Sequence, residues 1–313
     1  MRASTQSVTV RAPAKINIRL GVGPQRPDGF HDLSTVFHAL RLSDDVIAER
    51  DDKGRVSVDV VAAEGSDVDV AAVPTDETNL AHQAAQALRR YAGVECGVRL
   101  TIVKRIPVAG GLAGGSADAA AALVACDAVW ETGCGRAELA TLGARLGSDV
   151  PFSLHGGTVL GSGRGEHLCP VMAPATLHWV LAVADGGLST PEVYRELDRM
   201  RAGGAVAAPS VPAGLLTALR QGDLPEIAAH LGNDLQAAAC GLRPGLLDVL
   251  DAGEGLGALG GIVSGSGPTV VFLAADADSA HDIADDLAAG GICRAAVPTS
   301  GSAAGARVVE SVS

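Results

Sequence analysis

The sequence predicts an α+β protein of about two domains, and three observations support this fold class. Segments with alternating apolar residues predict half-buried strands, as in Ile16, Ile18 and Leu20 set against Asn17 and Arg19. Segments with helical spacing lie between them, without the regular βαβα order of a doubly wound sheet. The 313 residues include 47% hydrophobic residues, which is enough for a substantial core.

The first half of the chain predicts strands and helices in turn. Val56, Val58 and Val60 alternate with polar residues and predict a strand. Residues 79–91 have helical spacing, and residues 98–102 alternate again as a strand. Two helices should follow, at 116–130 and at 136–146, the second ending before Gly147.

The second half continues with a glycine-rich hairpin at 155–165 and a buried strand from Leu177. Residues 200–212 are rich in Gly, Ala and Pro, so we expect an irregular surface segment there. Further helices and an apolar strand at 269–274 complete the chain.

Charge and composition exclude several classes of function. The net charge of −12 argues against nucleic-acid and anionic-membrane binding through bulk electrostatics. The six cysteines form no C-x-x-C pair, which fits a reducing compartment rather than a disulfide framework or a zinc site. The N-terminus lacks a signal-peptide core, and no apolar run reaches spanning length. We therefore expect a cytoplasmic protein, monomeric or homodimeric.

The stretch KRIPVAGGLAGGSADAAAA, residues 104–122, is the main candidate for a ligand site. Two glycine pairs separate a strand from a helix-forming alanine run, so unpaired N–H groups and a positive helix end would meet at one point. This favours a phosphate site over a purely structural turn. Ser116 stands where a Walker motif has lysine, so the stretch is not that P-loop, and we expect Ser116 to be the N-cap.

Asp118 conflicts with this interpretation, because a carboxylate in the first helical turn would repel a bare phosphate. A bound Mg²⁺ would remove the conflict. An Asp118 side chain turned away to cap or to pair would also remove it.

Three other segments carry candidate site residues. In PAKINI, Lys15 and Asn17 share a polar strand face with Arg19. In GIVSGSGPTVV, Gly265 and Gly267 flank Ser266, which predicts either a tight turn or a backbone anion site. In LGSDVPF, Asp149 is either an ordinary turn residue or a proton acceptor.

One motif is misleading. The G-x-G-x-x-G match from Gly255 to Gly260 follows the polar residues DAGE and leads into a strand-like segment. A dinucleotide fingerprint must follow a strand and open a helix, so this match does not support a nicotinamide site.

Together, PAKIN, PVAGGLAGGSADAAA and GSGPT resemble the GHMP kinase superfamily in order and spacing, over about residues 8–309. The resemblance implies a ribosomal-S5-like N-terminal domain, residues 1–173, and a ferredoxin-like C-terminal domain, residues 174–313, with the site in the cleft between them.

The resemblance also implies an activity: transfer of the ATP γ-phosphoryl group, with Mg²⁺, to the 2-hydroxyl of a cytidine diphosphate-linked methylerythritol. Within the family, the segments RPDGFH, GSDVPF and STPEVY favour this small-molecule acceptor. Homoserine and mevalonate-type kinases are the nearest alternatives. A nucleotide-binding protein without turnover would not need both Lys15 and Asp149.

By position, Lys15 and Asp149 match the family's catalytic pair. Because phosphoryl transfer passes through a loose transition state, we hypothesise that Asp149 mainly orients the hydroxyl and accepts its proton late, while Lys15 holds Asp149 and offsets charge. The expected ATP contacts are Asn79, Pro107, Val108, Ala109, Gly110, Gly111, Leu112, Ala113, Gly114, Gly115, Ser116 and Ala117. The expected acceptor contacts are Asn17, Phe30, His31, Tyr194, Gly265, Ser266 and Thr269.

Ser116 is also the expected magnesium ligand, because a hydroxyl at that helix start can reach a metal bridging the phosphates. The sequence departs from the family pattern at three positions. Phe30 stands where tyrosine is common, which keeps the stacking face. Ala109 and Ala113 stand where glycine is common, and we expect Ala113 to hold a negative φ.

Overall fold

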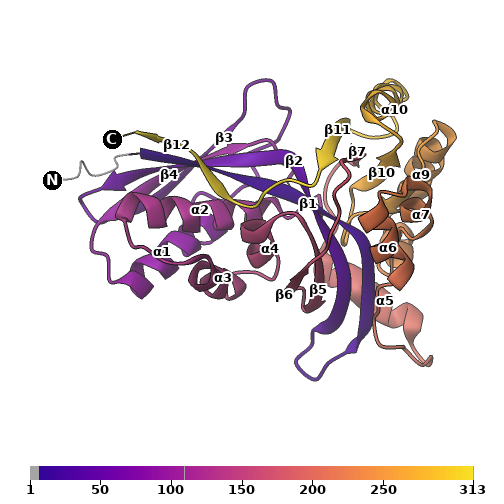
Figure 1. The fold of residues 1–313 in the computed structure, drawn as a ribbon, viewed down its shortest axis with the longest axis horizontal. Helices are drawn as coiled ribbons and strands as arrows, with labels where there is room; N and C mark the ends of the chain where they lie inside the picture. Colours follow the sequence, from indigo (N-terminus) through magenta and orange to yellow (C-terminus); the bar gives the residue numbers. More distant parts are fainter. Residues whose placement is uncertain (1–6, 109, 313) are drawn as a thin grey trace.

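The computed structural model describes residues 7–108 and 110–312, and it confirms the α+β prediction. Figure 1 shows strands and helices mixed along the chain. The strands are β1 (Ser7–Gln25), β2 (His31–Asp51), β3 (Val56–Ala62), β4 (Gly97–Lys104), β5 (Thr158–Gly163), β6 (His167–Pro170), β7 (Leu177–Val183), β8 (Gly232–Asn233), β9 (Gly260–Val263), β10 (Val270–Ala274), β11 (Ala295–Gly301) and β12 (Arg307–Val312).

The helices fall into two groups along the chain. Those of the first half are α1 (Leu80–Ala92), α2 (Gly114–Trp130), α3 (Arg136–Ala144) and α4 (Val150–His155). Those of the second half are α5 (Thr190–Arg201), α6 (Ala213–Gln221), α7 (Leu224–Ala229), α8 (Gln236–Leu242), α9 (Gly245–Gly255) and α10 (Ala277–Ala289).

A long antiparallel ribbon of β1 and β2 runs through the molecule (Figure 1). β1 also pairs with β12 and β8, while β2 also pairs with β4, β5 and β11. The two strands have 19 and 21 residues, far longer than the usual five or six. Because both halves of the fold pair with this ribbon, side chains along it can face a space between them.

The first half packs helices α1 to α4 on one side of the sheet (Figure 1). The alanine-rich α2 is buried along most of its length against β1 and β2. Small side chains let a helix approach a sheet closely, which explains the alanine run as packing. At the end of α2, the Trp130 indole donates a hydrogen bond to the Gly97 carbonyl at 3.0 Å, so the one large residue keeps its polar atom satisfied.

The second half builds a smaller sheet of β11, β7, β10 and β9 in that order. Phe272 fills the space between this sheet and α9, where a Cβ on Gly253 would lie 2.3 Å from its ring. β11 meets the ribbon at Gly301 and Leu40, and β12 then returns to pair with β1. The last strand, β12, thus belongs to the sheet of the first half. The division into domains at residues 173 and 174 stays a prediction.

Most predicted elements occur within a few residues of their expected bounds, but the start of α2 was wrong. The helix begins at Gly114, its N-cap is Ala113, and Ser116 is already inside the first turn. The Ala117 N–H bonds to the Ala113 carbonyl at 2.9 Å, because Ala113 adopts a left-handed conformation that closes the turn early. The predicted cap role of Ser116 is thus incorrect.

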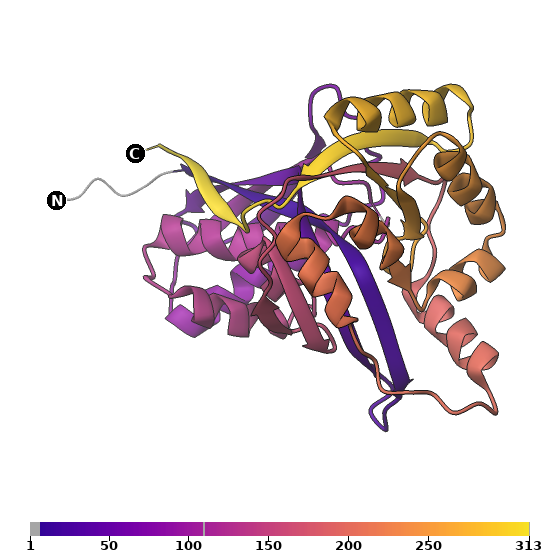
Figure 2. The ribbon, with the colours of Figure 1, turned by 45° about the vertical axis from the view of Figure 1, so that its right-hand side comes forward.

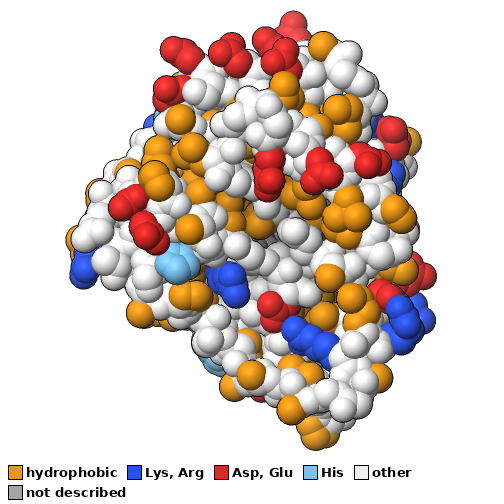
Figure 3. Space-filling view, turned by 90° about the vertical axis from the view of Figure 1, so that its right-hand side faces the viewer, with side chains coloured by type: hydrophobic (Ala, Val, Ile, Leu, Met, Phe, Trp, Pro, Cys, Tyr) orange, Lys and Arg blue, Asp and Glu red, His pale blue; other side chains and the backbone are white. Residues whose placement is uncertain are grey.

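The surface reflects the acidic composition. Figure 3 shows acidic side chains gathered at the top of the face that carries α10, with basic side chains lower on the same face. Across residues 7–108 and 110–312, every helix falls short of the length or the apolar character that a membrane span requires.

Candidate functional site

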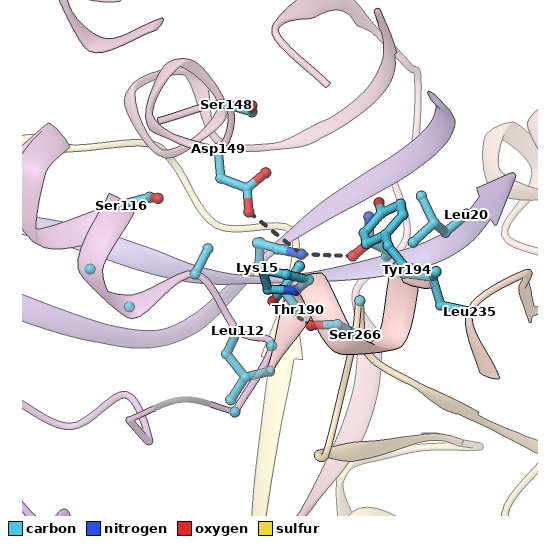
Figure 4. A pocket seen from close by; sticks show the side chains of 18 of the residues that line it. Lys15, Leu20, Leu112, Ser116, Ser148, Asp149, Thr190, Tyr194, Leu235 and Ser266 are labelled. Carbon is cyan, nitrogen blue, oxygen red and sulfur yellow. Dashed lines mark hydrogen bonds and ion pairs between the residues drawn. The ribbon is translucent and has the colours of Figure 1, made fainter. Parts of the chain in front are cut away.

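A cavity of about 800 Å³ lies between the two halves, and we call it the main cavity. Its walls come from β1, the β1–β2 turn, the glycine stretch, and the starts of α2, α4 and α5, together with the turn between β9 and β10. Figure 4 shows side chains from these distant segments pointing toward one another. The fold thus brings the separate sequence motifs into one space.

Lys15 is the buried centre of this cavity. Its ammonium donates a hydrogen bond to Asn17 Oδ1 at 2.7 Å and lies 3.7 Å from Asp149 Oδ2 (Figure 4). It also sits 5.5 Å from the centre of the Phe37 ring, a favourable cation–π distance. Its backbone N–H donates to the Leu112 carbonyl at 3.1 Å, so the same residue ties β1 to the glycine stretch.

A chain of hydrogen bonds fixes how Asn17 points. Its Nδ2 donates to Thr35 Oγ1 at 2.7 Å, and the Thr35 hydroxyl donates to the Arg19 carbonyl at 2.6 Å. The amide oxygen is therefore left to accept from Lys15. The Arg19 side chain leaves this polar face, because the β1–β2 register shifts between Asn17 and Arg19.

Asp149 occupies the N-cap position of the short helix α4, directly before Val150 and Pro151. Its carboxylate makes no capping bond, and 30% of the side chain is exposed. Figure 4 shows Asp149 extending toward Lys15 with Ser148 beside it. The cap position therefore holds the backbone in place while the carboxylate remains available to a ligand.

Most of the predicted phosphate loop lines the main cavity. The lining residues are Pro107, Val108, Gly110, Gly111, Leu112, Ala113, Gly114, Gly115 and Ser116. Ala117 is fully buried and does not line the cavity, and Ala109 lies outside the described residues. The first N–H groups of α2 have no intrahelical acceptors, and the residues that carry them, Gly114, Gly115 and Ser116, line the main cavity.

Two positions in the loop show why its backbone is unusual. Gly111 has a φ of +73°, and a Cβ there would lie 2.3 Å from the Ser264 carbonyl oxygen. Ala113 has a φ of +57°, so the expected negative φ was wrong. A left-handed alanine costs about 1–2 kcal/mol, and the loop retains it because Ala113 closes the first turn of α2.

A buried ion cluster lies at the base of the loop. The Lys104 ammonium donates to Asp118 Oδ2 at 2.8 Å and to Asp44 Oδ2 at 2.5 Å. The second oxygen of Asp44 accepts the N–H groups of Arg105 and Ile106. Asp118 therefore turns away from the loop to pair, which is the second of the two expected alternatives. The cluster joins β2, β4 and α2.

The cluster holds two carboxylates for one ammonium, and this imbalance contributes to raised pKa values of both Asp118 and Lys104. Burial, and after it the nearby Asp44 charge, raises the pKa of Asp118 to about 8 although Lys104 opposes the change. Burial alone would lower the pKa of Lys104, but the two carboxylates outweigh it and raise that pKa. Asp118 Oδ1 is buried without a hydrogen-bond partner among the described residues, which a protonated carboxyl tolerates better than a carboxylate.

An aromatic pair closes the opposite side of the main cavity. The rings of His31 and Tyr194 lie 5.0 Å apart, and His31 Nε2 is 2.9 Å from Asp198 Oδ1. Burial, and to a lesser extent the charge of Asp149, raises the pKa of Tyr194 to about 12, so its phenol is neutral near pH 7. Phe30 lines the cavity but is 51% exposed, with the Arg164 guanidinium 5.0 Å from its ring centre.

The turn between β9 and β10 approaches Lys15 from the second half. Gly265 has a φ of +55°, and its missing Cβ would lie 3.5 Å from the Lys15 ammonium. Ser266 lines the cavity and shares a hydrogen bond of 2.8 Å with Thr190 (Figure 4). Thr269 is buried and does not line the cavity; its hydroxyl lies behind Gly110. The segment is both a tight turn and a cavity wall.

Asn79 takes a different place from the one expected. It does not line the main cavity; its Oδ1 accepts from the Ala81 N–H and caps α1. Its Nδ2 donates to the Pro74 carbonyl at 2.6 Å, and Pro74 does line the cavity. Asn79 therefore positions a wall of the cavity and does not itself line the cavity.

The Gly255 motif is also misplaced for a dinucleotide, since it runs from the end of α9 into β9.

Several residues that line the cavity were not predicted from the sequence, among them Lys104, Arg164, Thr190 and Asp198. Lys104 had one usable signal, a lysine at the end of an alternating strand directly before the glycine stretch. Asp198 had none, because its contact with His31 joins residues 167 positions apart.

The buried ion cluster predicts how stability depends on pH. The pKa of Asp118 is raised above its unfolded value of 3.8, so its contribution is fully present below that value and is lost as pH rises through about 8. Asp118→Asn removes this titration. Between pH 5 and 8 the wild type should lose unfolding free energy relative to Asp118→Asn, by at most about 1.4 kcal/mol per pH unit.

Urea unfolding at several pH values measures this difference. Asp251→Asn, on the exposed side of α9, is the matched control and should follow the wild type. Parallel pH profiles for wild type and Asp118→Asn would show that Asp118 keeps an ordinary titration.

Comparisons with known proteins agree with this geometry. Family models for "GHMP kinases N terminal domain" and "GHMP kinases C terminal" match residues 79–157 and 215–293. The chain is similar to the 4-diphosphocytidyl-2-C-methyl-D-erythritol kinase of Salinispora arenicola, with 56% identity over 96% of this chain and 93% of the relative.

Solved structures show the same relationship. The chain is similar to a crystal structure of 4-(cytidine 5'-diphospho)-2C-methyl-D-erythritol kinase, with a TM-score of 0.75 and 32% identity over 93% of this chain and 98% of that one. A homoserine kinase from Cytophaga hutchinsonii has a TM-score of 0.73 at 20% identity over 99% of both chains, which shows a shared fold alone. The chain therefore belongs to the GHMP kinase family.

Proposed function

We propose that this chain transfers the γ-phosphoryl group of ATP to the tertiary 2-hydroxyl of 4-diphosphocytidyl-2-C-methyl-D-erythritol, a step of the non-mevalonate route to isoprenoid precursors. One observation carries the proposal. A single cavity holds the Lys15–Asp149 pair between an amide-rich loop and the aromatic pair of His31 and Tyr194. The name shared by the chain's relatives agrees with this assignment.

ATP would bind with its phosphates at the glycine loop. The N–H groups of Gly114 and Gly115 open α2, and the positive helix end favours the phosphate charge. Gly110 and Gly111 let the loop backbone pack closely against Thr269 and Ser264 of the second half, where a Cβ would clash. The adenine would lie toward Pro74, whose position Asn79 sets.

Asp149 and Lys15 would act on the acceptor hydroxyl. The Asp149 carboxylate can accept a hydrogen bond from the hydroxyl and hold its oxygen in line with the γ-phosphorus. Because phosphoryl transfer passes through a loose transition state, orientation matters more than early removal of the proton, and Asp149 takes that proton late. Lys15, held by Asn17, keeps Asp149 in place and offsets charge near the transferring group.

Magnesium fits the wall that carries Ser116. The Ser116 hydroxyl and the Asp149 carboxylate present hard oxygen atoms to the same cavity, without side-chain hydrogen bonds among the described residues. Within that part of the chain, no three His, Cys, Asp or Glu side chains form a metal cluster, which suits an ion that keeps water and phosphate ligands. Bound Mg²⁺ would neutralise charge on the phosphate oxygens.

The Ser116→Ala variant tests this ligand. The magnesium concentration for half-maximal activity should rise in Ser116→Ala, and an unchanged concentration would show that Ser116 is not a ligand.

The cytosine would stack in the aromatic region at the far end of the cavity. His31 and Tyr194 form one face, and the exposed Phe30 ring is available as a second contact. Stacking of a base on an aromatic side chain contributes about 1–3 kcal/mol. Gly265 and Ser266 would support the diphosphate and sugar from the β9–β10 turn, while the buried Thr269 would act only indirectly, by packing behind Gly110. We also propose a cytoplasmic location, which the free cysteines favour.

A panel of acceptors tests the substrate assignment. ATP consumption should depend on 4-diphosphocytidyl-2-C-methyl-D-erythritol, while homoserine and mevalonate should give at least about 100-fold lower kcat/KM, because neither can fill the aromatic end of the cavity. Equal or higher kcat/KM for homoserine or mevalonate would reject the cytidine-linked acceptor and leave the phosphoryl-transfer site intact.

Steady-state kinetics test the two central residues. Asp149→Asn and Lys15→Ala should each lower kcat by about 100-fold or more with a modest change in the KM for ATP, since both act at the acceptor hydroxyl. Asp52→Asn and Lys53→Ala change exposed residues of the same types and serve as controls. Near-normal kcat in both site variants would remove these residues from the mechanism.

A further inference from the structure

A second cavity, of about 440 Å³, lies outside the proposed active site. One wall is β1 around Arg19 to Val22, and the other is the irregular segment 202–210 that leaves α5. Figure 2 shows the chain between α5 and α6 crossing the β1–β2 hairpin. This is the surface segment that the sequence predicted to be irregular.

Glycines on β1 let this segment lie directly on the strand. A Cβ on Gly23 would lie 2.9 Å from the Pro209 ring, and a Cβ on Gly21 would lie 3.3 Å from the same proline. The proline therefore packs against bare backbone. This contact forms one side of a cavity that remains open to solvent and shares no lining residue with the main cavity.

Arg19 supplies an unpaired positive charge to the second cavity. Its guanidinium lies against Gly232, where a Cβ would be 2.3 Å from Nη1. Among the described residues, the Arg19 side chain has no hydrogen-bond or ion-pair partner, and its Nε is buried. In a chain with a net charge of −12, a half-buried arginine that lacks an acidic partner is unusual.

The other charges of the cavity neutralise each other. Arg201 donates to Asp234 Oδ2 at 3.0 Å and to the Val22 carbonyl at 2.7 Å. Asp234 Oδ2 also accepts the Val22 N–H at 2.9 Å. These bonds fix Arg201 and Asp234 to the strand, so the net charge of the lining side chains is the single positive charge of Arg19.

We propose that the second cavity is a binding site for a small anion, held through a phosphate or carboxylate group by the Arg19 guanidinium. A guanidinium presents parallel N–H donors that match both groups, and a partly enclosed setting strengthens such charge-assisted bonds. The evidence for this site is the Arg19 side chain and the residues around it, and it does not depend on the proposed kinase activity. Its walls do include β1 and α5, which also carry Asn17 and Tyr194 of the main cavity.

Isothermal titration calorimetry at constant ionic strength tests the site. The probes are inorganic phosphate and malonate, added to protein already saturated with a non-hydrolysable ATP analogue so that the glycine loop is filled. At least one probe should bind the wild type saturably. Its affinity should fall by about tenfold or more in Arg19→Gln, the loss of a charge-assisted hydrogen bond.

Arg90→Gln, which removes an exposed arginine from α1, should bind as the wild type does. Arg19→Lys keeps the charge and most of the packing but loses the planar fork, so it should bind with intermediate affinity. This variant keeps the test decisive if Arg19→Gln folds poorly by circular dichroism. Saturation by phosphate alone or by malonate alone identifies the preferred group. Failure of both probes to bind, or unchanged binding in Arg19→Gln and Arg19→Lys, would overturn the proposal.

Discussion

The burial of one ammonium group, that of Lys15, constrains much of this structure. A charge removed from water must be paired and hydrogen-bonded, or the residue is unstable where it lies. Lys15 meets this requirement with Asn17 on its own strand and Asp149 at the start of α4. Its backbone also binds the glycine stretch through Leu112. Three segments that are distant in sequence are thereby fixed around one point.

A second buried ammonium, Lys104, fixes the base of the same loop. It holds Asp44 on β2 and Asp118 on α2, so the helix that presents its N-terminus to the cavity cannot shift independently of the sheet. Phosphate groups are held best by donors that are already in place before the ligand arrives. The two lysines therefore have complementary positions, since Lys15 lies beside Asp149 at the proposed reaction site and Lys104 anchors the helix that would hold the phosphates.

The sequence predicted much of the site because its chemistry lies in short local motifs. Lys15 and Asn17 share a strand, and the glycine pairs precede an alanine helix, so spacing alone marked them. Their convergence followed from the family resemblance. The failures were of two physical kinds. Ala113 in a left-handed conformation, and with it the early start of α2, depends on backbone strain that the surrounding loop supports. The pairing of Lys104 with Asp44 and Asp118, and of His31 with Asp198, depends on tertiary contacts that no local pattern encodes.

In the proposed reaction, the Lys15–Asp149 pair directs a phosphoryl group to one particular hydroxyl. Phosphorus and carbon NMR of the reaction product tests it most directly, because the coupling of phosphorus to carbon identifies the esterified oxygen. We expect one new phosphomonoester, at C2 of the methylerythritol unit, formed in equal amount to ADP. Release of free phosphate without an ester, or an ester at another hydroxyl, would contradict it.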